Sequence, residues 1–251
     1  MWDAGKAEIS LYRTTGQWEG APRVYETRIV VVKEDFRKET LAKVEPPATK
    51  GTFEGLEMNY SLDVPTGTED HHQAVSVLFD RRTFRPLRLD MASVETDGVT
   101  FVTALPLARS LQHVSHSFWD GDRTRTIPWS DNALFYDALP VWLRSLDLAT
   151  PATYDIQLLP TQLSSHVQDV TPVPAHIVVA GHEGAPSMTS RGGYRVEVTF
   201  AGKEDRLWFH PGPGHTLMVW EKSDGSVLTL KKNVWLPYWE KTKPGDEAVL
   251  E

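Results

Sequence analysis

The sequence predicts a mainly β protein built as one antiparallel sheet that is strongly curved or forms a partly open β-barrel. Stretches that alternate apolar and polar side chains recur about a dozen times, and "AVSVLF" (74–79) is typical: every second residue faces the same side, as in a half-buried strand. Asp-Gly pairs stand between such stretches at 97–98, 120–121 and 224–225. Because these pairs suit the tight turns of β-hairpins, we expect consecutive strands to be antiparallel neighbours.

One segment breaks this pattern and predicts a short, broken helical element at about residues 130–148. In "SDNALFYDALPVWLRSLDL" the apolar residues fall near helical spacing, and Ser130 or Asp131 suits the helix cap. Pro140 lies in its middle, where it removes a hydrogen bond and clashes with the preceding turn. We therefore expect two short helical pieces, with Pro140 at or near the start of the second, covering one mouth or face of the sheet.

The chain length and the absence of a repeat predict a single β-rich domain over residues 1–251. A length of 251 residues lies within the range of one all-β domain. The proline-containing stretch "VTPVPAH" leaves open a second arrangement, in which two lobes of this domain meet near residues 170–176.

Composition excludes several classes of function. The formal net charge of -8 argues against nucleic acid as a partner, because phosphate binding needs clustered Lys and Arg. The longest apolar runs, such as "IVVV" (29–32), are too short for a transmembrane segment. The chain has no cysteine, which excludes thiol nucleophiles, disulfides and Cys-ligated metals. We find neither a P-loop nor a dinucleotide fingerprint, and we expect no cofactor.

The nine histidines do not predict a metal site. His113 and His116 in "HVSH" are three residues apart, and a strand places such residues on opposite faces. The neighbours His71 and His72 are separated in the same way. No HExxH helix is present.

The stretch "RLWFHPGPGHTLMVW" holds the least implausible catalytic residues, Asp205, His210 and His215. Two histidines flank a Pro-Gly-Pro-Gly loop, and they come close to each other if that loop joins two strands. The prolines lack the N–H groups that a phosphate-binding loop uses, so a simple hairpin joint is the favoured interpretation. A hydrolase with a carboxylate–histidine site remains the alternative function.

Tryptophan is the more informative residue type. A curved sheet with many large rings can enclose an apolar cleft, although an ordinary aromatic core is the other interpretation. The candidate ligand-binding residues are Trp119, Trp142, Trp208 and Trp220.

The C-terminal stretch "SVLTLKKNVWLPYW" predicts a strand that ends at Pro237, after which Tyr238 and Trp239 cap one end of the barrel. Alternation assigns one face to the core. That face carries Leu228, Leu230, Lys232, Val234 and Leu236.

Four stretches carry a resemblance to a known family: "WDAGKAEISLY", "VVVKEDFRKETLAKVE", "SLDVPTGTEDHHQAVSVLFDRRTFRPLRLDMASVE" and "LPYWEKTKPGDE". They resemble an uncharacterised bacterial family of exported proteins and lipoproteins that is often labelled "septum formation inhibitor Maf". The resemblance runs from near Trp2 to near Glu247, with Ala4 where the family usually has Gly. The Maf nucleotide pyrophosphatases themselves are α/β proteins with their own N-terminal signature, which this chain lacks, so their activity is not transferred.

The resemblance implies a domain similar to open β-barrels of unknown function and of lipoprotein-carrier type. It also implies a signal peptide or a lipidated cysteine ahead of Trp2, and hence a periplasmic or outer-membrane-anchored protein in a bacterium. The predicted function is a non-enzymatic cell-envelope protein that binds a lipid-like apolar ligand or an envelope partner protein.

Overall fold

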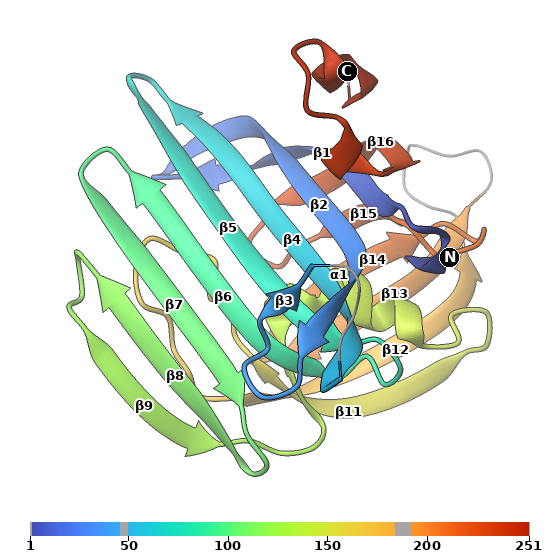
Figure 1. Cartoon of the computed structure of the whole chain (residues 1–251), viewed down its shortest axis with the longest axis horizontal. Helices are drawn as coiled ribbons and strands as arrows, with labels where there is room; N and C mark the ends of the chain where they lie inside the picture. The colour runs from blue at the N-terminus through green and yellow to red at the C-terminus, as the bar shows by residue number, and fades with distance from the viewer. Residues whose placement is uncertain (1, 46–49, 184–191, 251) are drawn as a thin grey trace.

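The computed structural model describes residues 2–45, 50–183 and 192–250 and folds them around one sixteen-stranded sheet (Figure 1). The strands are β1 Ala7–Trp18, β2 Ala21–Arg37, β3 Lys43–Val44, β4 Thr52–Thr66, β5 Glu69–Asp80, β6 Pro86–Glu95, β7 Gly98–Pro106, β8 Ser110–Ser117, β9 Arg123–Pro128, β10 Ala133–Phe135, β11 Ala152–Leu159, β12 Val173–Glu183, β13 Gly193–Phe200, β14 Lys203–Phe209, β15 Leu217–Glu221 and β16 Val227–Leu236. The helical elements are η1 Trp2–Ala4, η2 Tyr136–Ala138, α1 Leu139–Trp142, η3 Leu143–Ser145, η4 Tyr238–Glu240 and η5 Asp246–Leu250, of which only α1 is an α-helix and the others are 3-10 turns. No helix in the described part of the chain is both long and apolar enough to cross a bilayer.

The sheet is antiparallel except where β10 pairs with β11. Its order is β10-β11-β12-β13-β14-β15-β16-β1-β2-β4-β5-β6-β7-β8-β9, with β3 paired to β2 beside this path. The last long strand, β16, therefore pairs with the first, β1. In the described residues β9 and β10 end the order without pairing to each other, so the sheet curls but does not close. The predicted open, antiparallel fold is confirmed.

The three Asp-Gly pairs lie at hairpin connections, as expected. Gly121 and Gly225 have φ of +74° and +86°, a conformation that glycine adopts without steric cost. Gly98 serves a different purpose, because it opens β7 after the turn. A Cβ at that position would lie 2.8 Å from the ring of Phe118, so the glycine makes room for this side chain.

Irregularities in the strand ladders go together with the curl. The register shifts in four of them: β1–β16, β5–β6, β12–β13 and β14–β15. An extra residue in one strand bends that strand and increases its local twist. The long strands β2 and β4 lie side by side in the part of the sheet between the shifted β1–β16 and β5–β6 ladders (Figure 1).

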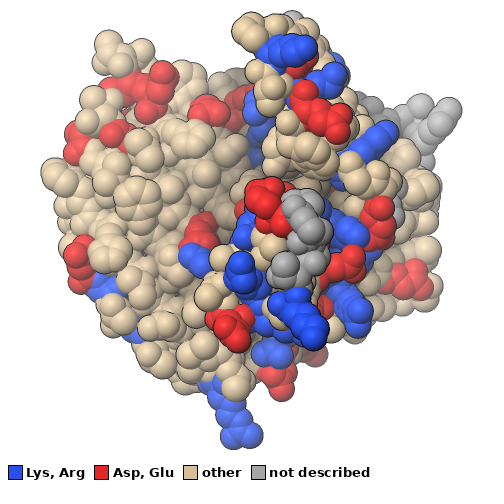
Figure 2. Space-filling model, viewed as in Figure 1, with Lys and Arg blue, Asp and Glu red and all other residues tan. Residues whose placement is uncertain are grey.

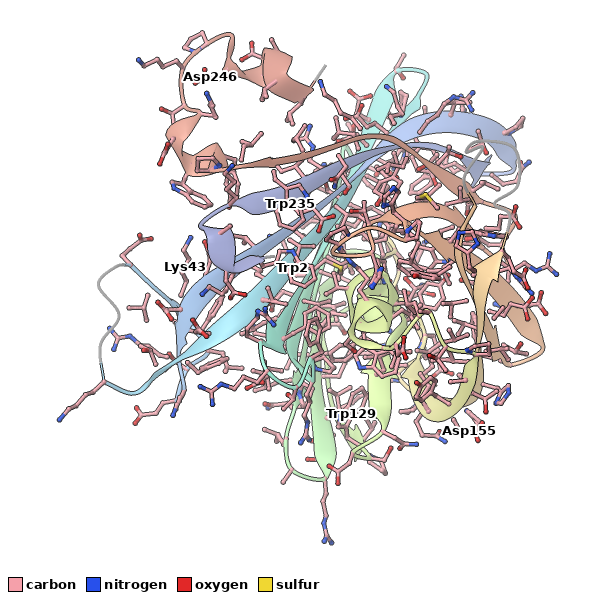
Figure 3. The ribbon with its side chains drawn as sticks, turned by 90° about the vertical axis from the view of Figure 1, so that its right-hand side faces the viewer. Trp2, Lys43, Trp129, Asp155, Trp235 and Asp246 are labelled. Carbon is pink, nitrogen blue, oxygen red and sulfur yellow. The ribbon has the colours of Figure 1, made fainter. Side chains whose placement is uncertain are left out.

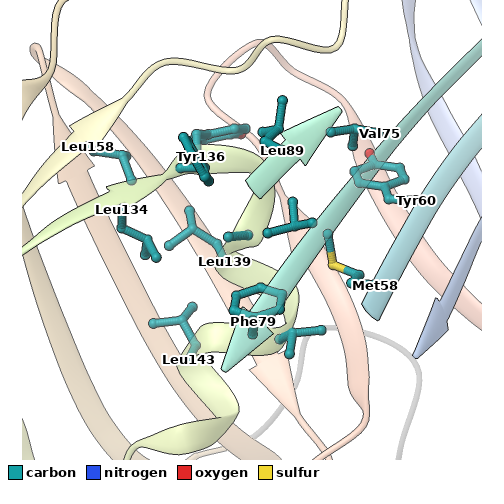
Figure 4. Packing of buried hydrophobic residues seen from close by; sticks show 14 of the residues in the cluster. Met58, Tyr60, Val75, Phe79, Leu89, Leu134, Tyr136, Leu139, Leu143 and Leu158 are labelled. Atoms are coloured by element: carbon teal, nitrogen blue, oxygen red, sulfur yellow. The ribbon is translucent and has the colours of Figure 1, made fainter. Parts of the chain in front are cut away.

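The short helical segment fills this interior (Figure 4). Leu139, Val141 and Leu143 are fully buried, and they belong to one core cluster with Met58 and Phe79 of the facing strands. Pro140 lies in the first turn of α1, as the sequence predicts. The helical part is shorter than the predicted 130–148 because residues 133–135 pair with β11 as the strand β10.

A buried carboxylate holds this segment in place. Asp205 on β14 accepts hydrogen bonds from the Tyr136 hydroxyl at 2.6 Å, the Trp220 indole N–H at 2.8 Å and the Ser223 backbone N–H at 2.9 Å. Burial, and then the neighbouring carboxylate, raises the pKa of Tyr136 above its usual value. The Tyr136 hydroxyl therefore stays a donor to Asp205 at every physiological pH.

A buried ion pair ties the same segment to β1 from the other side. Arg144 of η3 contacts Glu8 at 2.8 Å, and their side chains are only 4% and 1% exposed. Glu8 also accepts hydrogen bonds from Thr216 and Asn233. The guanidinium lies 4.8 Å from the ring centre of Trp2, which packs beside Trp235 (Figure 3).

The faces of β16 differ in part from the prediction. Leu228 and Leu230 do face the core, but the register shift between β16 and β1 reverses the alternation beyond them. Trp235 therefore packs against the core, while Val234 and Leu236 join a small cluster on the outer face of the sheet.

The two aromatic residues that follow β16 do not form a buried cap. Tyr238 and Trp239 are 39% and 46% exposed, and their rings contact each other edge-to-face. The predicted closure of the barrel end by these rings is wrong. The C-terminal segment instead lies over the outer face of the sheet (Figure 1).

The Glu8–Arg144 pair yields a stability prediction. We expect Arg144→Met to lower the free energy of unfolding by about 3–5 kcal/mol, because Glu8 is left charged and unpaired in the interior. Adding Glu8→Gln should cost less than the sum of the two single changes, since the pair acts as a unit. Urea denaturation measures both, with the exposed Arg125→Met as the control. An unchanged midpoint for Arg144→Met would contradict this role.

Candidate functional site

The structure does not bring Asp205, His210 and His215 together. Asp205 lies near the start of β14, fully buried, with its oxygens engaged by three donors. His210 directly follows the far end of that strand, and His215 precedes β15. The carboxylate and the two imidazoles are thus separated by nearly the whole length of β14.

The two histidines organise the connection between β14 and β15. The backbone N–H of His210 donates to Thr216 O at 2.8 Å, and Nδ1 of His210 accepts from Gly212 N–H at 2.9 Å. The Nδ1 atom of His215 lies 3.2 Å from the carbonyl oxygen of His210. Their interactions are those of a hairpin joint.

The four candidate tryptophans occupy separate places. Trp220 is fully buried and bonded to Asp205, and Trp142 packs at the edge of the core. Trp208 belongs to a second cluster with Met218 and Val219. Trp119 is 41% exposed beside Phe118. They do not line one common pocket.

The histidine pairs are divided between the two faces of the sheet, as their spacing predicts. His71 and His113 are buried, whereas His72 and His116 are exposed. In the described residues no group of three or more His, Asp or Glu side chains is placed to hold a metal ion.

The concave face of β5 to β8 is covered by residues 160–172, which we call the strap. The strap has no regular secondary structure, and polar contacts hold it. Gln162 bonds to His113 at 3.1 Å, and its backbone N–H donates to the buried Asp137 at 2.8 Å. Further along, the backbone N–H of Val167 donates to Asp120 at 2.9 Å.

Ser165 is the central contact of the strap. The backbone carbonyl of Ser165 accepts a hydrogen bond from the Thr100 hydroxyl at 2.6 Å. The Ser165 hydroxyl donates to the Glu95 carboxylate and accepts from the side-chain amide of Gln73. His71 lies 3.3 Å from the same carboxylate. Burial alone would raise the pKa of Glu95, but the hydrogen bonds from Ser165 and His71 outweigh it and lower the pKa. Strap, helical segment and core side chains occupy the interior, and a binding space with an apolar lining lies outside it.

That space is a groove on the outer face of the sheet, and its floor is apolar. Ile9 pairs with Val30, and Val30 pairs with Asn59, so these side chains form a row across β1, β2 and β4. Leu236 and Val234 of β16 continue the apolar surface. An outward face of an antiparallel sheet normally meets water and carries polar side chains, so the apolar side chains Ile9, Val30, Val234 and Leu236 need a cover.

The C-terminal segment, residues 237–250, forms the cover. Pro237 ends the pairing of β16, and the chain turns through η4 and η5 until Leu250 packs onto Ile9 and Leu236. Its turns close on themselves through Lys241 N–H to Tyr238 O at 2.9 Å and Asp246 N–H to Lys243 O at 3.0 Å. In Figure 3 Asp246 stands well off the sheet, so this cover arches over the strands.

The groove between cover and floor has a volume of about 600 Å³. It is lined by Ile9, Arg28, Val30, Asn59, Leu236, Tyr238, Lys241, Thr242, Lys243, Pro244, Asp246, Glu247, Val249 and Leu250. Pockets of about 300–1,000 Å³ with an apolar lining and a few polar groups are typical of small-molecule sites. The charged groups that line it belong to the C-terminal segment and to Arg28 of β2.

One sequence signal points to this surface, although tryptophan content does not. The stretch "IVVV" at 29–32 is apolar at four consecutive positions. In a strand with one solvent-exposed face, apolar and polar residues alternate instead. Ile29 and Val31 are buried in the core, while Val30 faces the groove. Such an unbroken run indicates that the outer face is covered as well.

Comparisons with known proteins support the fold. No family model matches the chain, and no curated protein matches it. Among solved structures, the chain is similar to a crystal structure described as a β-barrel-like protein of a domain of unknown function, DUF1849, from Brucella abortus. The TM-score is 0.55 at 10% sequence identity, over 92% of this chain and 98% of that one. At this identity the likeness establishes a β-barrel-like fold and no activity.

The strap leads to a prediction about pH. The pKa of Glu95 is below its usual value of 4.5, so the stability it confers is complete above the pKa of the unfolded chain and is lost as the pH falls through the folded value. We expect Glu95→Gln to lower the free energy of unfolding by about 1–3 kcal/mol at neutral pH. As the pH is lowered, the free energy of unfolding of this variant should decrease less than that of the wild type. Urea titrations between about pH 7 and pH 3 measure this. The exposed Glu240→Gln is the control, and equal acid sensitivity of Glu95→Gln and wild type would refute the assignment.

Proposed function

We propose that this protein is a non-enzymatic binding protein of the bacterial cell envelope that holds an apolar chain in the groove under its C-terminal segment. The observation that carries the proposal is the apolar floor on the outward face of β1, β2 and β16, which the cover leaves partly open. The resemblance of the sequence to an exported family supports the location. In this proposal the protein lies in the periplasm or is anchored at the outer membrane.

Physical reasons favour an apolar ligand at this place. Burial of hydrocarbon is favourable by about 0.8 kcal/mol for each methylene group, so even a medium-length chain gains several kcal/mol from the floor. The strands of the floor are fixed by pairing on both sides, which leaves little of the site to be ordered on binding. The groove has no carboxylate–histidine pair, because no histidine is among its lining residues.

The binding proposal is tested by a polar substitution in the floor. We expect Val30→Asn to weaken binding of 1-dodecanoylglycerol by about tenfold or more, because a polar amide that must lose water on binding then replaces an apolar contact with the chain. Isothermal titration calorimetry measures the affinity. Val24→Asn is the matched control, since Val24 lies on the same outer face of β2, is 53% exposed and does not line the groove. Equal losses in both variants would refute the proposal.

An envelope protein as partner is the second candidate, and a second outward surface favours it. Val94, Val99 and Phe101 on β6 and β7 are 44%, 41% and 47% exposed, and Val94 pairs directly with Val99. Figure 2 shows that the outward face over β5 to β8 is largely free of charged side chains. Exposed apolar patches of this kind mark contact surfaces.

The location and the partner are tested together in cells. A photo-crosslinker at position 101 should form an adduct with an exported protein that mass spectrometry identifies, whereas the same group at position 24 should not. An adduct with a cytoplasmic protein, or equal adducts from both positions, would contradict this candidate.

A further inference from the structure

The residues that line the groove include more cations than carboxylates. Three cations line it, on β2 and on the C-terminal segment: Arg28, Lys241 and Lys243. Two carboxylates line it as well, Asp246 and Glu247. These five side chains differ in whether they already form hydrogen bonds or ion pairs within the protein.

The two carboxylates serve the fold of the cover. Asp246 accepts the backbone N–H of Lys243 at 2.9 Å, and Glu247 accepts the backbone N–H of Gly245 at 2.8 Å. Gly245 has a φ of +92°, a conformation that suits glycine, so these two bonds close a tight turn within the cover. Each carboxylate is thus directed at the backbone of its own turn.

The cations have no comparable engagement. Within the described residues the side chains of Lys241 and Lys243 form no ion pair, and both residues are exposed. Arg28 faces Glu26 only at 3.7 Å, with each side chain 47% exposed. Three positive groups are therefore available to a ligand, beside carboxylates that are directed elsewhere.

Arg28 is placed to meet one end of an amphiphile, and Lys241 and Lys243 line the same groove. Arg28 and Val30 are two residues apart on the same face of β2, which places their Cα atoms about 7 Å apart along the strand. A chain that lies on Ile9 and Val30 therefore places its head within reach of the guanidinium. Carboxylate and phosphate oxygens match the fork of an arginine and the point charge of a lysine.

We propose that the ligand of the groove is a single-chain amphiphile with a negatively charged carboxylate or phosphate head, which Arg28, Lys241 and Lys243 hold while the chain lies on the apolar floor. This inference rests on the proposed function. It adds the charge of the head group and the residues that recognise it.

The experiment compares three ligands that share one chain: dodecanoate, dodecyl phosphate and the uncharged 1-dodecanoylglycerol, each titrated calorimetrically below its micelle concentration. At low ionic strength we expect the better anion to bind the wild-type protein at least tenfold more tightly than the uncharged ester. The double variant Lys241→Gln/Lys243→Gln should lose most of this difference and keep the affinity for the ester, which reports that the groove is intact. Because the cations are exposed, added salt should reduce the difference in the wild type.

A matched control separates local from overall charge. Lys203→Gln/Lys231→Gln removes two exposed lysines that do not line the groove, and it should retain the preference for the anion. A preference for dodecyl phosphate over dodecanoate would assign the head to a phospholipid source, and the reverse to a free fatty acid. Equal affinity of the wild type for the ester and both anions would overturn the inference and leave the proposed function standing. No binding of any of the three would overturn both.

Discussion

The structure depends on one constraint: a sheet that curls without closing has a concave face that the chain itself must cover. In the part of the chain that the structure describes, the strands from β10 to β9 form one path with two free ends, and no ladder joins these ends. The residues between β9 and β12 cover the concave face, first with the helical segment and then with the strap. Each part is held by a buried carboxylate or ion pair, namely Asp205, Asp137, Glu95 and the Glu8–Arg144 pair. Removing water from these charges is costly, and only full hydrogen bonding in one geometry offsets that cost.

Periodicity was sufficient to predict the fold class, because alternation and Asp-Gly turns are local properties of the chain. The curvature of the sheet and its failure to close are harder to predict from the sequence, because they depend on β-bulges and no sequence motif marks the bulges. The bulge between β1 and β16 shows the consequence: it sends Val234 and Leu236 to the outer face, although uninterrupted alternation places them with Leu228 in the core. A single extra residue reverses every later side chain of a strand.

The groove could not be predicted from residue types alone. Large aromatic rings suggested an internal cleft, but Trp220 fills the core and Trp142 packs at its edge. The groove needs segments that are far apart in sequence: Ile9, Val30 and Leu236 meet only because β16 returns to pair with β1. The run "IVVV" was a local sign of a second covered face, yet it does not say which segment covers it.

A filled interior also determines what a binding site on this fold can be. The concave face is closed by buried polar anchors, and a ligand there would have to displace groups such as Ser165 and Gln162 from their partners. The outer groove has no such barrier. The hydrogen bonds described for its cover join residues of the cover itself, and Leu250 contributes the apolar contact to the floor. Exposing the floor therefore costs apolar contact and breaks no strand ladder, so a ligand can enter while the core remains intact.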